Sequence, residues 1–486
     1  MKSTTLCIVL CSILISMLFI GCSDEAPFGL PKSDLGNNTI SKYVSIGNSL
    51  TAGYQSGALF EDGQRYGFPN LIAQQLIKAG ATIGTFEQPI WGNPGNPGSN
   101  GKAARIELVS LEGPDIRPRG LAPGTPLNAT LNRPYDNLGI PGAMIADFFD
   151  TTDVNTKLVT RQNLFFKHVL RDQSKGKSVF EQAKNISPKA DLISFWLGNN
   201  DVLLYAVYGG VIVAGGTVIP NAPTSATTFD QLYKAAIDSL KNNFPSAKII
   251  VANIPDIKAI PYFTTVNPGV VATYKGVIPF SYQKHGNRGV GDGVTYFTEP
   301  NPPLLTLASS AYIGKKGEWY RDNNVSVPSG IDTNQTMGID YTNPIPDALI
   351  LDSLEQAEIA KAVAAYNTTI ASVATSKNLA LVDIHTIFND IKKNGFRVSG
   401  ETYTADYVSG GLFSLDGIHP TGRGAGILAN EFIKVLNAKY GMHIPYVDIS
   451  QLPGIPAPLG KYAAGTLLPK LSPQAVKNIL ELWHRQ

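Results

Sequence analysis

The chain has 486 residues and a nearly balanced charge, with 40 Lys and Arg against 38 Asp and Glu. Charges of both signs are mixed along the sequence, so no basic field is present for binding nucleic acid. A hydrophobic content of 43% with 16% charged residues fits a globular enzyme with a large core. The 47 Gly and 33 Pro are scattered and indicate long ordered loops rather than disorder.

The N-terminus predicts export. Lys2 is followed by an apolar run over residues 6–20, which is too short and too early for a secure membrane span. The run ends in residues 19–22, whose sequence Phe-Ile-Gly-Cys resembles the lipobox of bacterial lipoproteins, although Phe19 replaces the usual aliphatic residue. We therefore expect residues 1–21 to be a signal peptide and Cys22 to carry the lipid.

Cysteine usage favours the same interpretation. Cys7 and Cys11 lie inside the apolar run, so cleavage would leave Cys22 as the sole cysteine of the mature chain. A lone cysteine in an exported chain needs an explanation, and lipidation supplies one. Residues 22–40 are polar with Gly and Pro and predict a tether between the lipid and the domain. The expected location is the bacterial outer membrane, with the protein held there by its acyl chains.

The first strand of the domain is predicted at residues 43–46, an alternating β-branched stretch. Gly47 then turns the chain, and Ser49 lies where a helix would begin. Its hydroxyl would project from the carboxyl end of the strand, the edge at which open α/β sheets bind their ligands. Backbone N–H groups of the new helix would favour negative charge at the same place.

The rest of the chain alternates strands with helices. Its pattern predicts these elements in order: a helix at 68–77, a loop region at 86–134, a turn opening a helix at 137–143, a strand at 190–197, a helix at 230–244, a strand at 247–254, an aperiodic insertion at 259–346, a helix at 354–374, a strand at 379–384, a helix at 427–438 and a tail helix capped by Ser472. This alternation predicts a three-layer α/β/α sandwich with a central parallel sheet and a large insertion.

Asp416 and His419 form a second candidate constellation, in a loop before the 427–438 helix. A serine hydroxyl is a poor nucleophile until a base takes its proton, and histidine is suited to that task. Asp416 could accept from the other ring nitrogen and stabilise the imidazolium. Taken alone, an Asp-x-x-His loop fits a structural histidine or half of a metal site equally well.

Two further residues could donate hydrogen bonds to an oxyanion. Asn200 follows the predicted strand at 190–197 and could offer its side-chain amide. Gly142 could offer a backbone N–H where a side chain would block close approach. The next acidic residue, Asp201, fits a buttress that holds the loop through hydrogen bonds.

The four motifs in this order resemble those of the SGNH hydrolases, the larger group around the GDSL lipases and esterases. The matching stretches are Gly47-Asn48-Ser49-Leu50, Asn137-Leu138-Gly139 with Gly142, Gly198-Asn199-Asn200-Asp201, and Asp416-Gly417-Ile418-His419-Pro420. Asn48 departs from the aspartate of the name-giving pattern, at a position that is not catalytic in the family.

The resemblance implies a flavodoxin-like fold and an ester hydrolase that needs no metal or other cofactor. It implies Ser49 as nucleophile, His419 as base, Asp416 as its orienter, and an oxyanion hole made of the Ser49 N–H, the Gly142 N–H and the Asn200 amide. The expected substrate is a small-molecule or glycan ester. The hydrolase domain would span residues 41–440, with residues 441–486 as an extension packed on it.

Other functions remain open from the sequence. A metal-dependent phosphoesterase could use residues 198–201, Asp383 with His385, and His419 as ligands. A noncatalytic surface lipoprotein that binds glycans would account for aromatic residues of the insertion such as Trp319 and Tyr320. An α/β-hydrolase fits poorly, because the sequence around Ser49 lacks the Gly-x-Ser-x-Gly elbow.

Overall fold

A computed structural model of the chain describes residues 33–110, 115–267, 281–284, 295–296, 302–398, 400–456 and 469–483. The predicted signal peptide, Cys22 and most of the tether lie outside these residues. No helix within the described ranges is long and apolar enough to cross a membrane.

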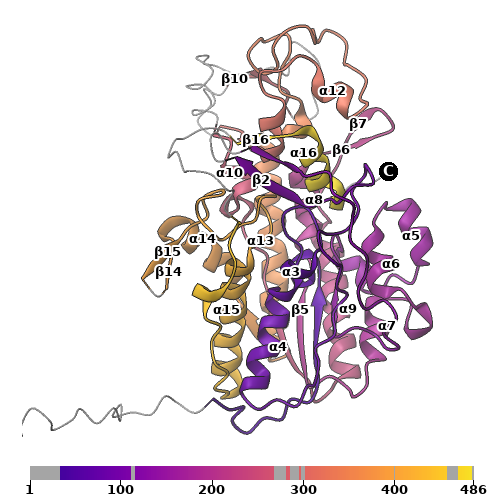
Figure 1. Cartoon of the computed structure of the whole chain (residues 1–486), viewed down its shortest axis with the longest axis vertical. Coiled ribbons are helices and arrows are strands. Elements are labelled where there is room, and N and C mark those ends of the chain that lie inside the picture. Colours follow the sequence, from indigo (N-terminus) through magenta and orange to yellow (C-terminus); the bar gives the residue numbers. More distant parts are fainter. Residues whose placement is uncertain are drawn as a thin grey trace, which may run out of the picture.

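The centre of the molecule is a five-stranded parallel sheet with the strand order β13-β8-β5-β1-β4 (Figure 1). Its strands are β1 (Tyr43–Gly47), β4 (Asn137–Gly139), β5 (Leu192–Trp196), β8 (Lys248–Ala252) and β13 (Ala380–Val382). Because all five run in one direction, the loops that follow them meet at the same edge. The predicted central parallel sheet is confirmed.

Side chains alternate between the two faces of this sheet and build two separate cores. Tyr43 and Trp196 pack with α4 (Phe68–Lys78) and α15 (Gly422–Tyr440) on one face. Val44, Ile46 and Phe195 pack on the other face with α9 (Ala226–Asn243) and α13 (Ser353–Ser376). Alternation along each strand thus requires helices on both sides, which gives the three-layer sandwich.

The remaining helices border this sandwich and its loops. They are α2 (Ser49–Ala52), α3 (Glu61–Arg65), α5 (Val154–Thr160), α6 (Leu164–Leu170), α7 (Val179–Lys184), α8 (Asn200–Val207), α10 (Pro261–Thr264), α12 (Glu318–Asp322), α14 (Ile384–Asn394) and α16 (Pro473–Leu480).

Short strands make up small additional sheets. The pairs are β6 (Val211–Ala214) with β7 (Thr217–Pro220), β9 (Ser281–Tyr282) with β10 (Thr295–Tyr296), β11 (Leu304–Leu305) with β12 (Ile350–Leu351), and β14 (Phe396–Val398) with β15 (Glu401–Tyr403), while β2 (Ile106–Ser110), β3 (Asp115–Pro118) and β16 (Lys470–Leu471) form a three-stranded sheet.

Two sequence-based expectations for secondary structure are wrong. The region 86–134, predicted as loop, contains β2 and β3, because β3 is held between β2 and the distant β16 rather than by local periodicity. The stretch 137–143, predicted as a turn opening a helix, begins with β4 and continues as a turn to a short 3-10 helix at Ile145–Phe148. β4 completes the sheet at one edge through its pairing with β1.

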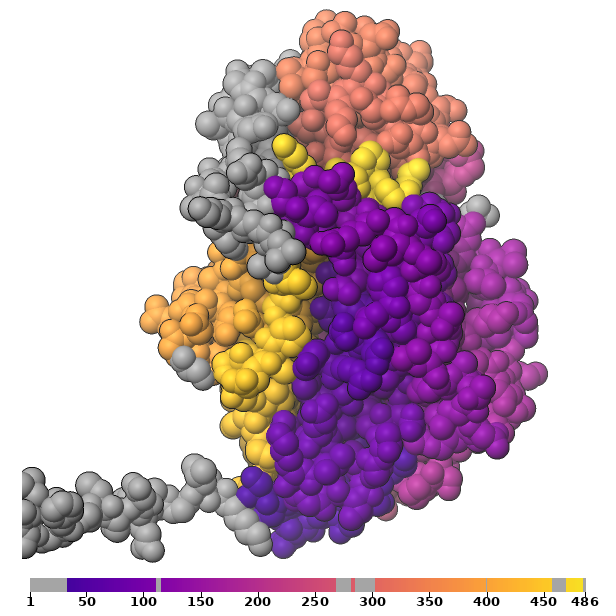
Figure 2. Space-filling view, in the orientation of Figure 1, coloured from indigo at the N-terminus to yellow at the C-terminus, as the bar shows by residue number. Residues whose placement is uncertain are grey.

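The C-terminal segment (469–483) lies above the carboxyl-end edge of the sheet. Its strand β16 pairs with β3, and its helix α16 contacts β3 and the 3-10 helix at Leu307–Ala311. In Figure 2 its yellow atoms lie between the purple surface that contains β2 and β3 and the salmon surface of residues after 302. The segment therefore joins the insertion to the main domain.

Candidate active site

Ser49 lies at the sharp turn between β1 and α2 and is 3% exposed. The Asn48 side chain caps the helix by accepting from the Leu50 N–H at 3.1 Å. A Cβ at Gly47 would lie 2.1 Å from Thr51 Oγ1, so only glycine fits at this turn. The helix begins at Ser49, as predicted, and has four residues, with Gly53 as its C-cap at a φ of 77°.

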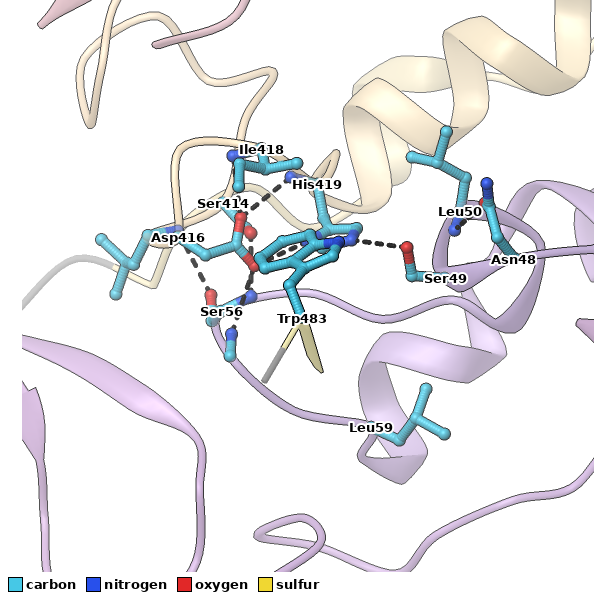
Figure 3. A network of polar contacts seen from close by, with 12 residues as sticks. Asn48, Ser49, Leu50, Ser56, Leu59, Ser414, Asp416, Ile418, His419 and Trp483 are labelled. Carbon is cyan, nitrogen blue, oxygen red and sulfur yellow. Dashed lines mark hydrogen bonds and ion pairs between the residues drawn. The ribbon is translucent and has the colours of Figure 1, made fainter. Parts of the chain in front are cut away.

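The structure brings Ser49, His419 and Asp416 together in one hydrogen-bonded row (Figure 3). His419 Nε2 is 2.8 Å from Ser49 Oγ, and His419 Nδ1 is 3.0 Å from Asp416 Oδ2. Because a carboxylate can only accept, Nδ1 carries the proton and Nε2 is left to accept from the serine hydroxyl. This orientation allows the imidazole to take a proton from Ser49.

The Asp416 carboxylate is held by several donors. Oδ1 accepts from the backbone N–H groups of Ile418 and His419, each at 2.9 Å, and Oδ2 accepts from the Gly57 N–H at 3.2 Å. Burial alone would raise the pKa of Asp416, but the His419 charge and these hydrogen bonds hold the pKa below its usual value. Asp416 therefore stays ionised beside His419.

A second loop fixes the Asp416–His419 turn and was not predicted from the sequence. The Ser56 N–H donates to Ser414 Oγ at 2.8 Å, and Ser56 Oγ accepts from the Leu415 N–H at 3.3 Å (Figure 3). Ser56 has a φ of 50°, which is uncommon for a residue other than glycine. The loop after α2 thus ties the serine motif directly to the histidine motif.

The two predicted oxyanion donors lie after neighbouring strands of the sheet. Gly142 follows β4 and has a φ of 79°, and an added Cβ would lie 2.8 Å from Asn163 Nδ2. Asn200 follows β5, is 1% exposed, and its Nδ2 donates to the Ala143 carbonyl at 2.8 Å. Asn200 is thereby held against the turn that contains Gly142.

Two backbone N–H groups in this region are available to bind an anion. Among the hydrogen bonds of the described residues, neither the Ser49 N–H nor the Gly142 N–H donates to a protein acceptor. Buried N–H groups in folded proteins are almost always paired. An unpaired N–H beside a serine hydroxyl is what a site for a developing oxyanion requires.

The C-terminal segment supplies two residues that the sequence analysis missed. Trp483 Nε1 donates to Asn200 Oδ1 at 3.1 Å. Its indole ring stacks on His419 (Figure 3), with 6.1 Å between ring centroids. The Leu482 carbonyl oxygen lies 2.7 Å from the position of a Cβ on Gly142. The only sequence signal in this segment was the Ser472 cap, and it gave no link to the site.

Three cavities lie beside this centre and the C-terminal segment. A cavity of about 10 Å³ is lined by residues that include Gly142, Asn200, Leu204 and Trp483. A larger cavity of about 600 Å³ is lined by polar residues such as Gln162, Asn323 and Glu481 and by apolar residues such as Val213, Val476 and Leu480. A third small cavity shares Gln162 and Glu481 with the larger one, and it also borders Tyr54 and Leu482.

The residues of the two alternative functions lie elsewhere or are engaged. Asp201 accepts from the Ile145 N–H and from Thr224 Oγ1, each at 2.9 Å, so it acts as a buttress. Within the ranges that the structure describes, no group of three or more His, Cys, Asp or Glu side chains is placed to hold a metal ion. Trp319 and Tyr320 are each 3% exposed and cannot stack on a glycan at the surface.

Comparisons with solved structures gave several proteins of low sequence identity. A protein from Parabacteroides merdae described as a GDSL-like lipase is 12% identical, with 84% of this chain and 99% of that chain covered and a TM-score of 0.31. An acetylxylan esterase from Geobacillus stearothermophilus is 12% identical, with coverages of 83% and 96% and a TM-score of 0.30. An extracellular lipase from Streptomyces rimosus is 12% identical, with coverages of 82% and 99% and a TM-score of 0.30.

A family comparison gives the firmer assignment. A sequence comparison with curated proteins gave no match. The model of the family described as GDSL-like lipase/acylhydrolase matches residues 43–432, which is most of the chain and includes Ser49, Gly142, Asn200, Asp416 and His419. The chain therefore belongs to the GDSL-like lipase/acylhydrolase family and is an ester-hydrolysing enzyme.

Proposed function

We propose that the protein is a serine esterase in which Ser49 is the nucleophile, His419 the general base and Asp416 the residue that orients the base. The observation that supports this assignment is the continuous row of hydrogen bonds from Asp416 through His419 to Ser49 Oγ. All three side chains are buried, which keeps bulk water from competing for these bonds.

The proposed reaction has two halves. Ser49 Oγ attacks the ester carbonyl carbon while His419 Nε2 takes the hydroxyl proton, and the tetrahedral intermediate collapses as His419 returns that proton to the leaving alcohol. A water then attacks the acyl-enzyme in the same way and releases the carboxylic acid with Ser49 restored. The ionised Asp416 stabilises the imidazolium that forms in each half.

The oxyanion hole in this proposal consists of the Ser49 N–H, the Gly142 N–H and the Asn200 Nδ2 amide. Two observations support it: the unpaired state of the two backbone N–H groups among the described residues, and the bond that holds Asn200 beside Ala143. Each such donor is worth roughly 3–4 kcal/mol of transition-state stabilisation in enzymes of this chemistry.

The substrate in this proposal is a small-molecule or glycan ester. The cavity beside Gly142 and Asn200 has a volume of about 10 Å³, that of a single water site, so of an acyl chain it admits at most a group the size of the acetyl methyl. The larger cavity borders Gln162 and Glu481, which also line the small cavity next to Leu482. We assign the larger cavity to the alcohol part of the ester, whose hydroxyl groups the polar side chains of the lining would bind.

The test of the proposed function is Ser49→Ala. The variant should lose at least about 1,000-fold in kcat on p-nitrophenyl acetate, because the bond-forming atom is gone. A fluorophosphonate probe should label the wild-type protein and not the variant. Thr51→Ser, two residues further along the same short helix, is the control and should retain labelling. Wild-type turnover in Ser49→Ala would end the serine-esterase assignment.

We also propose that the protein is a lipoprotein of the bacterial outer membrane, attached through Cys22. The proposal is supported by the lipobox-like residues 19–22 and by the absence of any other cysteine after residue 11. Acyl chains on Cys22 would hold the protein to a membrane without a spanning helix. Wild type should partition into the detergent phase, and Cys22→Ala should block maturation of the precursor or leave it tethered only by its uncleaved apolar run. Wild-type protein carrying an unmodified Cys22 would contradict the proposal.

A further inference from the structure

Trp483, in the C-terminal segment, contacts two residues of the proposed centre at once. Trp483 is 3% exposed, and its indole N–H donates to Asn200 Oδ1 at 3.1 Å. Its ring lies beside the His419 ring (Figure 3), at 10° from parallel. Trp483 and Asn200 are 283 residues apart in sequence. One side chain from the end of the fold thus touches both the proposed base and the third proposed oxyanion donor.

The hydrogen bond fixes which way the Asn200 amide points. An asparagine amide has an acceptor end and a donor end, and a half-turn about its last bond exchanges them. Here Oδ1 accepts from the indole N–H, while Nδ2 donates to the Ala143 carbonyl with one of its two hydrogens. A half-turn would place the carbonyl oxygens of Asn200 and Ala143 together and two N–H groups together. The second Nδ2 hydrogen is therefore kept available for substrate.

The C-terminal segment covers the centre without filling the oxyanion position. The Leu482 carbonyl oxygen lies on the Cα side of Gly142, 2.7 Å from where a Cβ would stand. In the described part of the chain it accepts from neither the Gly142 N–H nor the Ser49 N–H. A segment that blocked the hole would use a carbonyl oxygen to bind these N–H groups. The contacts instead fit a residue that completes the centre.

From these contacts we propose that Trp483 is a positioning residue for ester hydrolysis, an inference that rests on the proposed function. Its indole N–H holds the Asn200 amide in the orientation that donates to the oxyanion. Its ring stacks on His419, and the ring centroid of Tyr54 also lies 4.9 Å from that of His419. Stacked aromatic rings limit the rotation of the imidazole and keep water from it.

The test compares Trp483→Phe with Lys470→Ala. Trp483→Phe keeps an aromatic ring at the position and removes the N–H, whereas Lys470 is exposed on β16 of the same segment and lines none of the cavities described above. We expect kcat of Trp483→Phe to fall about three- to tenfold, the effect of one lost hydrogen bond, with KM within about twofold. Lys470→Ala should match the wild type in both constants.

A double-mutant cycle shows whether the effect passes through Asn200. Asn200→Ala should lower kcat by about 100-fold or more, as loss of an oxyanion donor does. If Trp483 acts by orienting the Asn200 amide, Trp483→Phe should cause no further loss in the Asn200→Ala background. A similar loss in both backgrounds would overturn the proposed positioning role.

Two other outcomes would also overturn it. A wild-type kcat in Trp483→Phe would overturn the positioning role. If Ser49→Ala is inactive in the same assay, the esterase assignment stands despite that result. A rise in kcat/KM for a chain that ends at residue 480 would show that the C-terminal segment blocks the centre rather than completing it. Activity in Ser49→Ala would overturn the esterase assignment and the positioning role together.

Discussion

At the scale of single residues, Leu204 borders the space that the proposed reaction leaves for the acyl group. It is 8% exposed and lines the small cavity together with Gly142, Asn200 and Trp483. In the proposed reaction the acyl chain extends into this cavity, so a chain longer than acetyl meets the Leu204 side chain. The cavity therefore predicts a preference for short acyl esters.

We expect Leu204→Ala to shift that preference toward longer chains. The ratio of kcat/KM for p-nitrophenyl butyrate to that for the acetate should rise about tenfold, the low end of what one or two methylenes are worth in an apolar pocket. Leu203→Ala is the matched control, because Leu203 packs on the core from the same helix and does not line the cavity. An equal rise in both variants would argue against acyl binding at this cavity.

At the scale of elements, the start of α13 holds a buried acid in its neutral form. Glu355 accepts from the Asp352 N–H at 2.8 Å and Asp352 Oδ1 accepts from the Glu355 N–H at 3.0 Å, which is a capping box. Burial, with the charges of Asp347 and Asp352, raises the pKa of Glu355 to about 10. The unfolded chain would ionise this group near its ordinary pKa of 4.5.

This shift makes the stability of the protein depend on pH. The folded protein binds the Glu355 proton more tightly than the unfolded chain does. The stability that this proton contributes is complete below pH 4.5 and is lost as pH rises through about 10. Glu355→Gln keeps an acceptor for the cap and has no proton to release. The unfolding free energy of the variant minus that of the wild type should therefore increase from pH 5 to pH 9, by at most about 1.4 kcal/mol per pH unit. Urea midpoints at pH 5, 7 and 9 would measure it, and a constant difference would contradict the shift.

At the scale of the whole molecule, the sheet was predictable because its middle strands carry their own signal. β1, β5 and β8 are buried on both faces, so they read as short apolar runs bounded by turns. β4 has only three residues, begins with Asn137, and exists through its pairing with β1. Local pattern does not reveal a strand of that kind.

The residues of the candidate site also fall into a group that the sequence predicts and a group that it does not. Ser49, Asn200 and Gly142 follow strands of one parallel sheet, so the fold itself brings their motifs to one edge. The Ser56 loop and Trp483 have no such constraint. Trp483 reaches the site because β16 pairs with β3 and carries α16 across the edge, and no spacing in the sequence encodes that pairing.

The first and last described parts of the chain lie at opposite ends of the strands of the central sheet. The N-terminal stretch lies against the end of α15, where Asn38 Nδ2 donates to the Tyr440 carbonyl at 2.9 Å, and it enters β1 at the strand's amino end. Trp483 lies over the carboxyl-end edge. The N-terminal stretch of the described residues therefore lies on the amino-end side of the sheet, away from the proposed catalytic edge. Because Trp483 contacts His419, an affinity tag placed close to Trp483 would disturb the proposed centre, and we expect immobilisation through the N-terminal side of the domain to preserve turnover.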